Sequence, residues 1–358
     1  MPAIHQLVAG FANGDAISNE ARVLQQLFRS WGFDSEIYCE QKRTLPELRP
    51  LARDLAQAPA EIGPRDIALL HLSIGSPANE VLPALAGRKA ILYHNITPPQ
   101  FFRGLNEEIR IHLERGRQQA CALAGKADLV MAVSRFNARE LEEVGFRNVQ
   151  VLPLFLDRTH WSQPPQRRVL QQVGDGKLNV LFVGRCAPNK RIEDVLAAFY
   201  YLQRYHEPES RLIHVGSPAG LERYHALLRA KCVELKLRDV LFAGSVRQEE
   251  LNAYYQKAHV FLCMSEHEGF CIPVLEAMAH RVPVLAHAAA AVPETLDGAG
   301  VLFTDKDFAA VAAMAHRLAR DQALREAVLK GQDERLARYT RQDLAGTLRA
   351  HLAPLLSA

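Results

Sequence analysis

The chain has 358 residues, of which 48% are hydrophobic and 23% are charged. This composition excludes a disordered or fibrous protein, and the length favours two globular domains. The 43 Lys and Arg residues against 40 Asp and Glu give a net charge of +3, too balanced to predict a nucleic acid or an acidic polymer as partner.

The first part of the sequence alternates short apolar runs with longer segments of helical periodicity, a pattern that predicts a β/α succession. Most of the apolar runs are hydrophobic at consecutive positions, as strands covered on both faces of a parallel sheet are. Ser18 is expected to cap the first helix and Gly32 to close it, and Ser134 and Gly145 bracket a later helix in the same way. The expected strands are 3–9, 35–39, 66–72, 89–94, 127–133 and 149–154.

A polar stretch with prolines and glycines, residues 157–177, interrupts this alternation and is typical of a linker between domains. The alternation then resumes, and from about residue 321 the pattern is helical, with spaced leucines that we expect to pack on a domain. The fold class is therefore α/β, with two doubly wound sheets in series. The expected strands of the second sheet are 178–184, 211–216, 240–244, 259–264, 282–287 and 300–303.

Two cations follow the first strand of the second sheet. Arg185 comes directly after Gly184, and Lys190 stands where the next helix is expected to begin. A guanidinium binds phosphate oxygens through two hydrogen bonds, an ammonium adds a point charge, and a helix N-terminus contributes free N–H groups. The loop therefore predicts a diphosphate site; the alternative is that both cations are solvated surface residues.

Two glutamates surround a later loop of the same sheet. Glu276 is expected in the first turn of a helix, where it can accept from the hydroxyls of a ribose, while Glu268 in the loop faces the other end of the same ligand. Gly269 lets the backbone approach the ligand, and the amides of Phe270 and Cys271 are then available as donors. The alternative is that Glu276 only complements the helix dipole and Glu268 is solvated.

The first sheet offers two further candidates. Gly14 and Asp15 lie in the loop after the first strand, where Gly14 can let amides approach a phosphate; a simple turn is the alternative. His94 and Asn95 end a strand at the edge where open sheets bind ligands, although a lone histidine usually has a structural role.

Several common motifs are missing from the sequence. The segment "GDGKL" lacks the first glycine and the Ser/Thr of a P-loop, no GxGxxG follows the first strand, and there is no DxD or carboxylate cluster suited to a divalent ion. Neither hydride transfer nor nucleotide hydrolysis is supported. The six cysteines show no metal-ligand spacing, and there is no signal peptide or long apolar run, so we expect reduced thiols in a cytoplasmic protein.

The segments "VGRCAPNK", "GSVRQEELNAYYQKAHVFLCMSEHEGFCIPVLEAMA" and "AVPETLDGAGVLF" resemble the C-terminal domain of family four glycosyltransferases, a large retaining group with the GT-B fold. The N-terminal half is similar more weakly, through "GDAISNEA", "HNITPP" and "ADLVMAVSRFNARELEEVGF". The resemblance implies two Rossmann-like domains facing across a cleft. It places an acceptor domain at 1–158, a linker at 159–177, a donor domain at 178–335, and a C-terminal helix at 336–358 that packs back on the first domain.

The resemblance also implies an activity: transfer of a hexosyl group from a UDP- or GDP-linked sugar to an acceptor hydroxyl, with retention and without a metal or other cofactor. Arg185 and Lys190 are then expected to hold the diphosphate, Glu276 the ribose and Glu268 the transferred sugar. The other implied site residues are His94 near the reacting carbon, Gly14, Asp15 and Gly184 near the phosphates, Val246 near the base, and the amides of Gly269, Phe270 and Cys271.

The implied setting is the assembly of cell-surface polysaccharide or glycoconjugate, with a sugar or a lipid-linked saccharide as acceptor and no nucleic acid partner. Two departures from the family pattern stand out: Cys271 replaces a common glycine, and alanines at 288–291 replace a glycine pair. The alternatives are a GT-B relative of other chemistry, such as a phosphorylase or nucleotide-sugar epimerase, and an inactive nucleotide-sugar-binding scaffold.

Residues 101–119 combine arginines with Phe101 and Phe102, which suits either a helix lying on the inner face of the plasma membrane or an ordinary solvated helix. The oligomeric state is left open.

Overall fold

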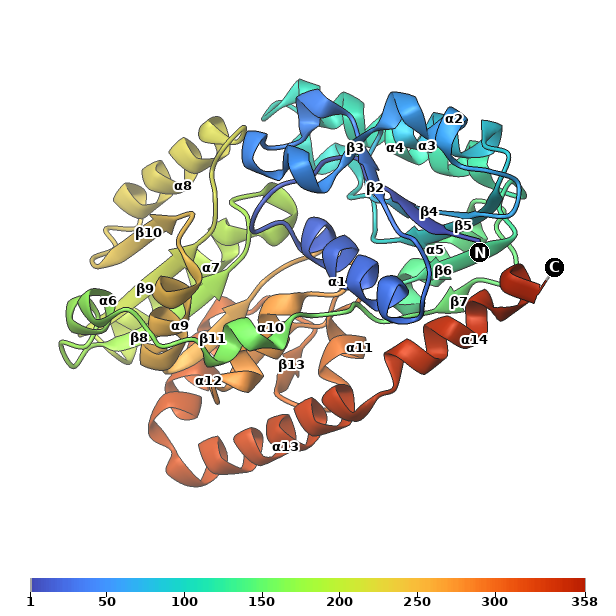
Figure 1. Cartoon of the computed structure of the whole chain (residues 1–358). Helices are drawn as coiled ribbons and strands as arrows, with labels where there is room; N and C mark the ends of the chain where they lie inside the picture. Colours follow the sequence, from blue (N-terminus) through green and yellow to red (C-terminus); the bar gives the residue numbers. More distant parts are fainter. Residues whose placement is uncertain (1, 358) are drawn as a thin grey trace. The chain divides into compact units, whose positions relative to one another are not determined.

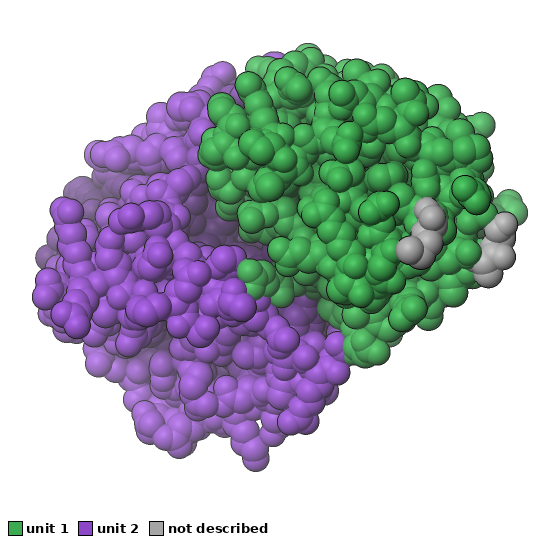
Figure 2. All heavy atoms as spheres, in the orientation of Figure 1, with its two compact units in different colours: residues 1–100, 108–157, 343–358 green, residues 101–107, 158–342 purple. Residues whose placement is uncertain are grey.

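The computed structural model describes residues 2–357, so the ends of the predicted ranges 1–158 and 336–358 lie outside the described residues. The chain divides into two compact units, coloured separately in Figure 2. Unit 1 holds the residues up to 100, residues 108–157 and those from 343 on, whereas unit 2 holds residues 101–107 and 158–342. Each unit contains one open parallel sheet, which confirms the predicted α/β class (Figure 1).

Unit 1 is built on a seven-stranded sheet in the order β3-β2-β1-β4-β5-β6-β7, and all its neighbouring strands are parallel. The direction of strand succession reverses between β1 and β4, so the loops after these two strands diverge and leave a crevice in which ligands of such sheets bind. The strands are β1 (Ile4–Leu7), β2 (Ile37–Cys39), β3 (Arg53–Asp54), β4 (Ile67–Leu72), β5 (Arg88–Tyr93), β6 (Leu129–Ala132) and β7 (Gln150–Val151). The α-helices are α1 (Ala16–Ser30), α2 (Ala58–Glu61), α3 (Pro77–Val81), α4 (Glu107–Leu123), α5 (Arg135–Glu143) and α14 (Leu344–Ser357). The 3-10 turns are η1 (Gln41–Arg43), η2 (Pro46–Leu51), η3 (Leu55–Gln57), η4 (Leu82–Ala84) and η5 (Pro99–Phe102).

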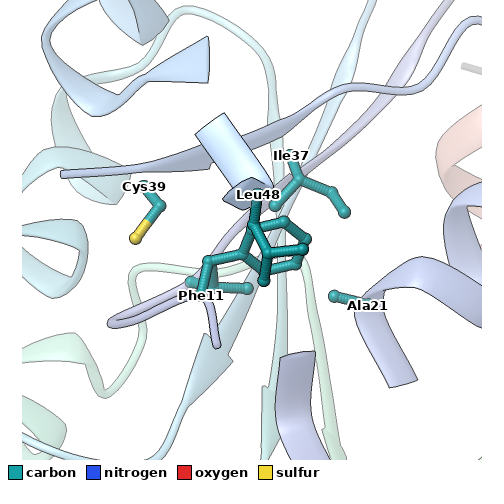
Figure 3. Packing of buried hydrophobic residues seen from close by; sticks show 6 residues of the cluster. Phe11, Ala21, Ile37, Cys39 and Leu48 are labelled. Atoms are coloured by element: carbon teal, nitrogen blue, oxygen red, sulfur yellow. The ribbon is translucent and has the colours of Figure 1, made fainter. Parts of the chain in front are cut away.

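A small apolar cluster anchors the loop that follows β1. Phe11 is fully buried and packs with Ala21 of α1, Ile37 and Cys39 of β2, and Leu48 of η2 (Figure 3). Three separate stretches of sequence thus hold the loop that leads to Gly14. Packing of this kind keeps a loop at one place above the sheet while its tip stays exposed.

The cap of α1 differs from the prediction. Asp15, rather than Ser18, is the N-cap residue, and its carboxylate accepts hydrogen bonds from the Ser18 amide at 2.8 Å and the Ser18 hydroxyl at 2.7 Å. The Ser18 hydroxyl instead accepts a hydrogen bond from the Ala12 amide at 3.0 Å. The prediction that Gly32 closes the helix is confirmed, since Gly32 follows the C-cap residue with a φ of +88°.

Unit 2 is built on a six-stranded sheet in the order β10-β9-β8-β11-β12-β13, which reverses its succession between β8 and β11. The strands are β8 (Leu178–Val183), β9 (Ser210–Val215), β10 (Val240–Gly244), β11 (Val260–Cys263), β12 (Val284–His287) and β13 (Val301–Phe303). The helices are α6 (Arg167–Gln172), α7 (Ile192–Tyr205), α8 (Glu222–Glu234), α9 (Gln248–Lys257), α10 (Ile272–Ala279), α11 (Val292–Leu296), α12 (Phe308–Arg320) and α13 (Gln322–Arg341), with 3-10 turns η6 (Arg158–Ser162) and η7 (Pro188–Lys190). Each apolar run expected as a strand contains one. Strand β3 was not predicted, because its two residues, Arg53 and Asp54, are charged and form no apolar run.

The stretch 159–177, expected as a linker, is folded and counts with unit 2. It contains η6 and α6, and Asn252 of α9 donates from its side-chain amide to the carbonyls of His160 and Gln163, both at 2.9 Å. These long-range bonds order a segment whose composition alone indicates a loop.

The C-terminal part forms two helices rather than a single helix over 336–358. Helix α13 belongs to unit 2 and α14 to unit 1. Within unit 1, Arg349 of α14 lies over the Trp31 ring at 5.6 Å, and the Arg88 guanidinium donates to the Leu355 carbonyl.

Three of the four arginines of the segment 101–119 have partners within the protein. Arg110 pairs with Glu114 at 2.8 Å, Arg115 pairs with Glu80 at 2.6 Å, and Arg117 donates to the Ile96 carbonyl at 2.8 Å. Among the described residues, no helix combines the length and the apolar character needed to cross a membrane.

Candidate active site

The loops after β8 and β11 bring Lys190 and Glu268 together at the point where the strand order of unit 2 reverses. Lys190 is the last residue of η7, two positions before α7 begins, and Glu268 lies in the loop before α10. The Lys190 Nζ lies 2.6 Å from each Glu268 carboxylate oxygen, and the Glu268 side chain is only 9% exposed. Burial opposes the charge of Lys190, but the Glu268 carboxylate outweighs it and raises the pKa of the ammonium group. Lys190 is therefore a fixed cation.

Asn189, which the sequence reasoning missed, joins these two loops through backbone groups. Its side-chain amide donates to the His267 carbonyl at 3.0 Å, and its own carbonyl accepts from the Glu266 amide at 2.9 Å. The loop carrying Glu268 is thus held beside Lys190 by two bonds at the residues that directly precede Glu268. In the sequence, the feature that could have pointed to Asn189 is its position between Pro188 and Lys190.

Two glycines, Gly184 and Gly216, lie where the loop after β8 begins. At Gly184, an added Cβ would lie 3.4 Å from the Phe182 ring and 3.7 Å from Lys190 Cε. The Gly184 carbonyl accepts from His214 Nε2 at 2.9 Å, and an added Cβ at Gly216 would lie only 1.8 Å from that carbonyl oxygen. Gly216 was not predicted as a site residue, yet it sets the space in which this loop turns.

Arg185 is exposed, and its guanidinium donates to the Ala219 carbonyl at 3.1 Å, in the loop after β9. Val246, expected near a nucleotide base, lies partly buried in the loop between β10 and α9. Both residues therefore lie in loops that follow strands of the same sheet. These loops share the carboxyl edge at which Lys190 and Glu268 meet.

The loop between β11 and α10 is held at several backbone positions. The Glu268 carbonyl accepts from the Ala291 amide at 3.2 Å, and the Phe270 carbonyl accepts from the Thr295 hydroxyl. Cys271 has a φ of +75°, a conformation that costs glycine nothing and other residues about 1–2 kcal/mol. Cys271 thus occupies a backbone conformation that favours glycine.

Glu276 lies in the second turn of α10 rather than in the first, because the helix begins at Ile272. The helix dipole acts within the first turn, so complementing the dipole does not explain this residue. Its carboxylate accepts from the Tyr255 hydroxyl at 2.9 Å, and burial raises the pKa of Glu276. Tyr255 stacks in turn on His280, with ring centroids 5.1 Å apart. Tyr255, another residue missed from the sequence, orients the carboxylate.

A second cluster of charged side chains fixes the start of the loop that carries Glu268. Lys306 Nζ lies 2.7 Å from Asp194 and 2.8 Å from Glu266, and Arg191 lies 3.1 Å from the same Asp194 carboxylate. Glu266 is thereby fixed two positions before Glu268. No sequence motif marked Lys306, which is 112 positions from Asp194.

In unit 1 the predicted residues take different roles. Gly14 has a φ of +73° at an exposed turn, and the Asp15 carboxylate is used to cap α1. His94 is nearly buried: its Nε2 lies 2.9 Å from His71 Nδ1 and its Nδ1 lies 3.5 Å from Glu20 Oε2. Both ring nitrogens thus face groups of unit 1, and neither His71 nor Glu20 was predicted.

A cavity of about 600 Å³ lies at the reversal point of the unit 1 sheet. Its lining comes from the loops after β1 and β4 and from α4, and includes Gly10, Phe11, Asp15, Arg43, Ser73 and His112. A second cavity, of about 680 Å³, is lined by residues that precede β9 and β10 and so lies at the amino ends of those strands. Only the first of these two has the position that ligands favour in doubly wound sheets.

Two groups of described side chains bring potential metal ligands within 4.8 Å of one another. The first group is Glu20, His71 and His94, and the second is Cys263, Glu268 and Cys271. In the second group both Glu268 oxygens already bind Lys190. In the first group both ring nitrogens of His71 lie 2.9 Å from polar atoms of Gln6 and His94.

Comparison with known proteins agrees with this geometry. Residues 177–321, which include Lys190, Glu268 and Glu276, match the family model described as "Glycosyl transferases group 1". The chain is 29% identical over 148 residues to O-antigen chain mannosyltransferase B of Escherichia coli, covering 41% of this chain and 38% of that protein. It is 40% identical over 114 residues to the GDP-mannose-dependent alpha-mannosyltransferase of Mycolicibacterium smegmatis, covering 31% of this chain and 26% of that protein. The matched regions thus span less than two fifths of these relatives.

The structure is similar to that of sucrose-phosphate synthase from Thermosynechococcus elongatus, with a TM-score of 0.77 over 99% of both chains and 18% sequence identity. This likeness concerns the fold. The family match covers the sheet that carries the Lys190–Glu268 pair, and the fold likeness extends over both units. Residues 177–321 are therefore similar to the group 1 glycosyltransferases, and the chain has the GT-B fold.

Proposed function

We propose that the protein transfers a hexosyl group from a nucleoside-diphosphate sugar to an acceptor hydroxyl and retains the anomeric configuration. One observation carries the proposal: a largely buried lysine–glutamate pair with 2.6 Å contacts at the reversal point of the unit 2 sheet. A cation at this place suits a diphosphate, and a carboxylate beside it suits sugar hydroxyls.

In the proposed reaction, the acceptor oxygen forms a bond to the anomeric carbon on the face from which the leaving phosphate oxygen departs. The bond from the anomeric carbon to the phosphate breaks, and the acceptor proton passes to that leaving oxygen. The protein's part is to hold the reactants and to stabilise the negative charge that develops on the diphosphate. Lys190 and Arg185 supply this positive charge, so the proposal needs neither a general base nor a metal ion.

The donor that we propose first is GDP-mannose, with UDP-linked hexoses as the alternative. A relative that matches 114 residues of this chain is named as GDP-mannose-dependent, and the other relative is named for the O-antigen chain. We propose a sugar or lipid-linked saccharide acceptor in polysaccharide assembly on the same basis. The cavity of unit 1 is the place we propose for that acceptor.

The donor is tested with a panel of UDP, GDP, ADP and their hexoses. Thermal shift measures binding, and nucleotide release with and without simple acceptors measures chemistry. We expect GDP and GDP-mannose to raise the melting temperature and GDP-mannose to be consumed slowly even without an acceptor. The rate is expected to be unchanged by a chelator. Tight binding without nucleotide release would support a scaffold, and loss of activity in the chelator would contradict the metal-independent mechanism.

Replacing Glu276 by glutamine is expected to raise the KM for the donor by about tenfold, since a hydrogen bond to a charged group contributes about 1.5 kcal/mol or more. The amide oxygen of glutamine can still accept from the Tyr255 hydroxyl, so the fold should be retained. Steady-state kinetics with varied donor gives the KM. In the matched variant Tyr255→Phe the carboxylate keeps its charge but loses the hydroxyl that orients it, and we expect a smaller rise in the donor KM together with a lower melting temperature. An unchanged donor KM in Glu276→Gln would remove the ribose assignment.

A further inference from the structure

Four buried polar side chains form a chain across unit 1, next to the carboxyl ends of its central strands. Gln6 lies in β1, His71 in β4, His94 directly after β5, and Glu20 in α1. Gln6 Oε1 lies 2.9 Å from His71 Nε2, His71 Nδ1 lies 2.9 Å from His94 Nε2, and His94 Nδ1 lies 3.5 Å from Glu20 Oε2. The side chains of His94 and Glu20 are 4% and 1% exposed. Water therefore cannot satisfy these groups, and they must satisfy one another.

The Gln6 side chain determines which atom donates and which accepts in its hydrogen bond to His71. Its side-chain NH2 donates to the Ala21 carbonyl at 2.9 Å, so its oxygen is the acceptor and His71 Nε2 must carry a hydrogen. Burial lowers the pKa of His71 to about 3, so the ring is neutral and Nδ1 bears a lone pair. That lone pair accepts from His94, which places a hydrogen on His94 Nε2.

At the other end of the chain, a lone pair faces a carboxyl oxygen. Burial, together with His71, lowers the pKa of His94 well below its usual value, so His94 Nδ1 also lacks a hydrogen. The Glu20 Oε1 atom accepts from the Phe155 amide at 2.9 Å, whereas the buried Oε2 makes no hydrogen bond within the described part of the chain. A carboxylate anion at Oε2 would be buried without a donor, which is strongly unfavourable.

We propose that Glu20 is a positioning residue, an uncharged carboxylic acid whose Oε2–H points at His94 Nδ1 and holds His94 as the Nε2–H tautomer. The 3.5 Å separation is longer than the ordinary hydrogen-bond range of about 2.5–3.2 Å, so the proposed bond requires a small rotation of the Glu20 carboxyl group toward His94. The groups that face the pair are the Phe155 amide from the segment after β7, His71 from β4 and, beyond His71, Gln6 from β1. Burial raises the pKa of Glu20 to about 8, in agreement with a neutral acid.

Any role of this arrangement in turnover rests on the proposed function. Within unit 1, an oriented, neutral His94 adds no positive charge at the carboxyl edge of the sheet. The same three side chains could instead hold a metal, but a metal bound to one ring nitrogen of His71 would replace the hydrogen bond that this nitrogen makes to His94 or Gln6. Metal binding is therefore an outcome that would contradict the proposal.

The tautomer is measured by NMR of the full chain with nitrogen-15 in its histidines, without donor and near pH 7. Signals are assigned by comparison with His71→Asn and His94→Asn. We expect hydrogen on Nε2 and none on Nδ1 in both rings. Glu20→Gln places an N–H donor at the same site and should keep this pattern, whereas Glu20→Leu removes the donor and should move the His94 Nδ1 signal to that of a ring nitrogen without a hydrogen bond. Hydrogen on Nδ1 of His94 in the unchanged protein, or metal-shifted ring signals after zinc is added, would overturn the proposal.

The charge of Glu20 is measured independently by urea unfolding at several pH values. The folded chain retains the Glu20 proton up to about pH 8 and the unfolded chain loses it near its ordinary pKa of 4.5. Folding stability from this group therefore falls as the pH rises between these values and is level above them. The unfolding constant should rise up to tenfold per pH unit more in the unchanged chain than in Glu20→Gln. Equal slopes would mean an ionised Glu20 and would refute the proposal. Neither measurement needs an active enzyme. Both can therefore be interpreted even if the protein proves not to transfer hexosyl groups.

Discussion

Replacing Lys190 by alanine is expected to lower kcat/KM for glycosyl transfer on the order of 10²–10³-fold, the usual effect of removing one charge-stabilising group from an active site. The reason lies in the 2.6 Å contacts between Lys190 Nζ and both Glu268 oxygens. Without the ammonium, the donor diphosphate loses a cation and meets an unpaired, largely buried carboxylate that repels it. Steady-state kinetics with donor and acceptor at fixed salt measures the loss.

The matched control is Lys177→Ala, which removes another lysine of unit 2 that is paired with an aspartate. Lys177 Nζ lies 2.7 Å from Asp239, just before β8 and at the opposite end of that strand from Lys190. Its removal should leave the rate within about twofold, since such pairs contribute about 1 kcal/mol or less to stability. The double variant Lys190→Ala with Glu268→Gln separates the lost cation from the exposed carboxylate. A Lys190→Ala enzyme as fast as the control would end the assignment of Lys190 to the diphosphate.

Replacing Gly216 by alanine is expected to destabilise unit 2 by about 3 kcal/mol, at the upper end for overpacking. The added Cβ would lie 1.8 Å from the Gly184 carbonyl oxygen and 3.1 Å from the Arg185 amide. Because these are backbone atoms, they cannot rotate away, and the loop carrying Arg185 must shift. Urea unfolding gives the stability, and thermal shift with GDP and UDP gives the loss of nucleotide binding.

Gly331→Ala is the control for this change. Gly331 lies inside α13, and an added Cβ there meets no atom within 4 Å. Alanine in a helix interior is about 0.5–1 kcal/mol more favourable than glycine, so this variant should be slightly more stable. If Gly216→Ala unfolds at the same urea concentration as the unchanged protein, the close approach of Gly216 to Gly184 does not hold in solution.

The fold class could be predicted from local patterns alone. Strands such as β4 and β8 are apolar at consecutive positions because both faces of the sheet are covered, and this property is visible in any short window of sequence. Gly32 and Ser134 marked helix ends correctly for a similar reason, since capping acts over three or four residues. The sequence offers two possible N-cap residues for α1, Asp15 and Ser18, and the pattern did not identify Asp15 as the residue that caps the helix.

The cations and carboxylates of the unit 2 site could also be predicted from the sequence, because the alternation of strands and helices assigns each of them to a loop on one edge of a sheet. The sequence could not predict which cation pairs with which carboxylate. Lys190 and Glu268 are 78 positions apart, and they meet only because β11 pairs with β8 at the centre of the sheet. The chain of Gln6, His71, His94 and Glu20 shows the same limit more strongly. Its neighbours Gln6 and His71 are 65 positions apart, and their protonation depends on a burial that exists only in the folded unit. Local pattern thus determines elements, whereas strand order and burial decide which polar groups meet and what charge they carry.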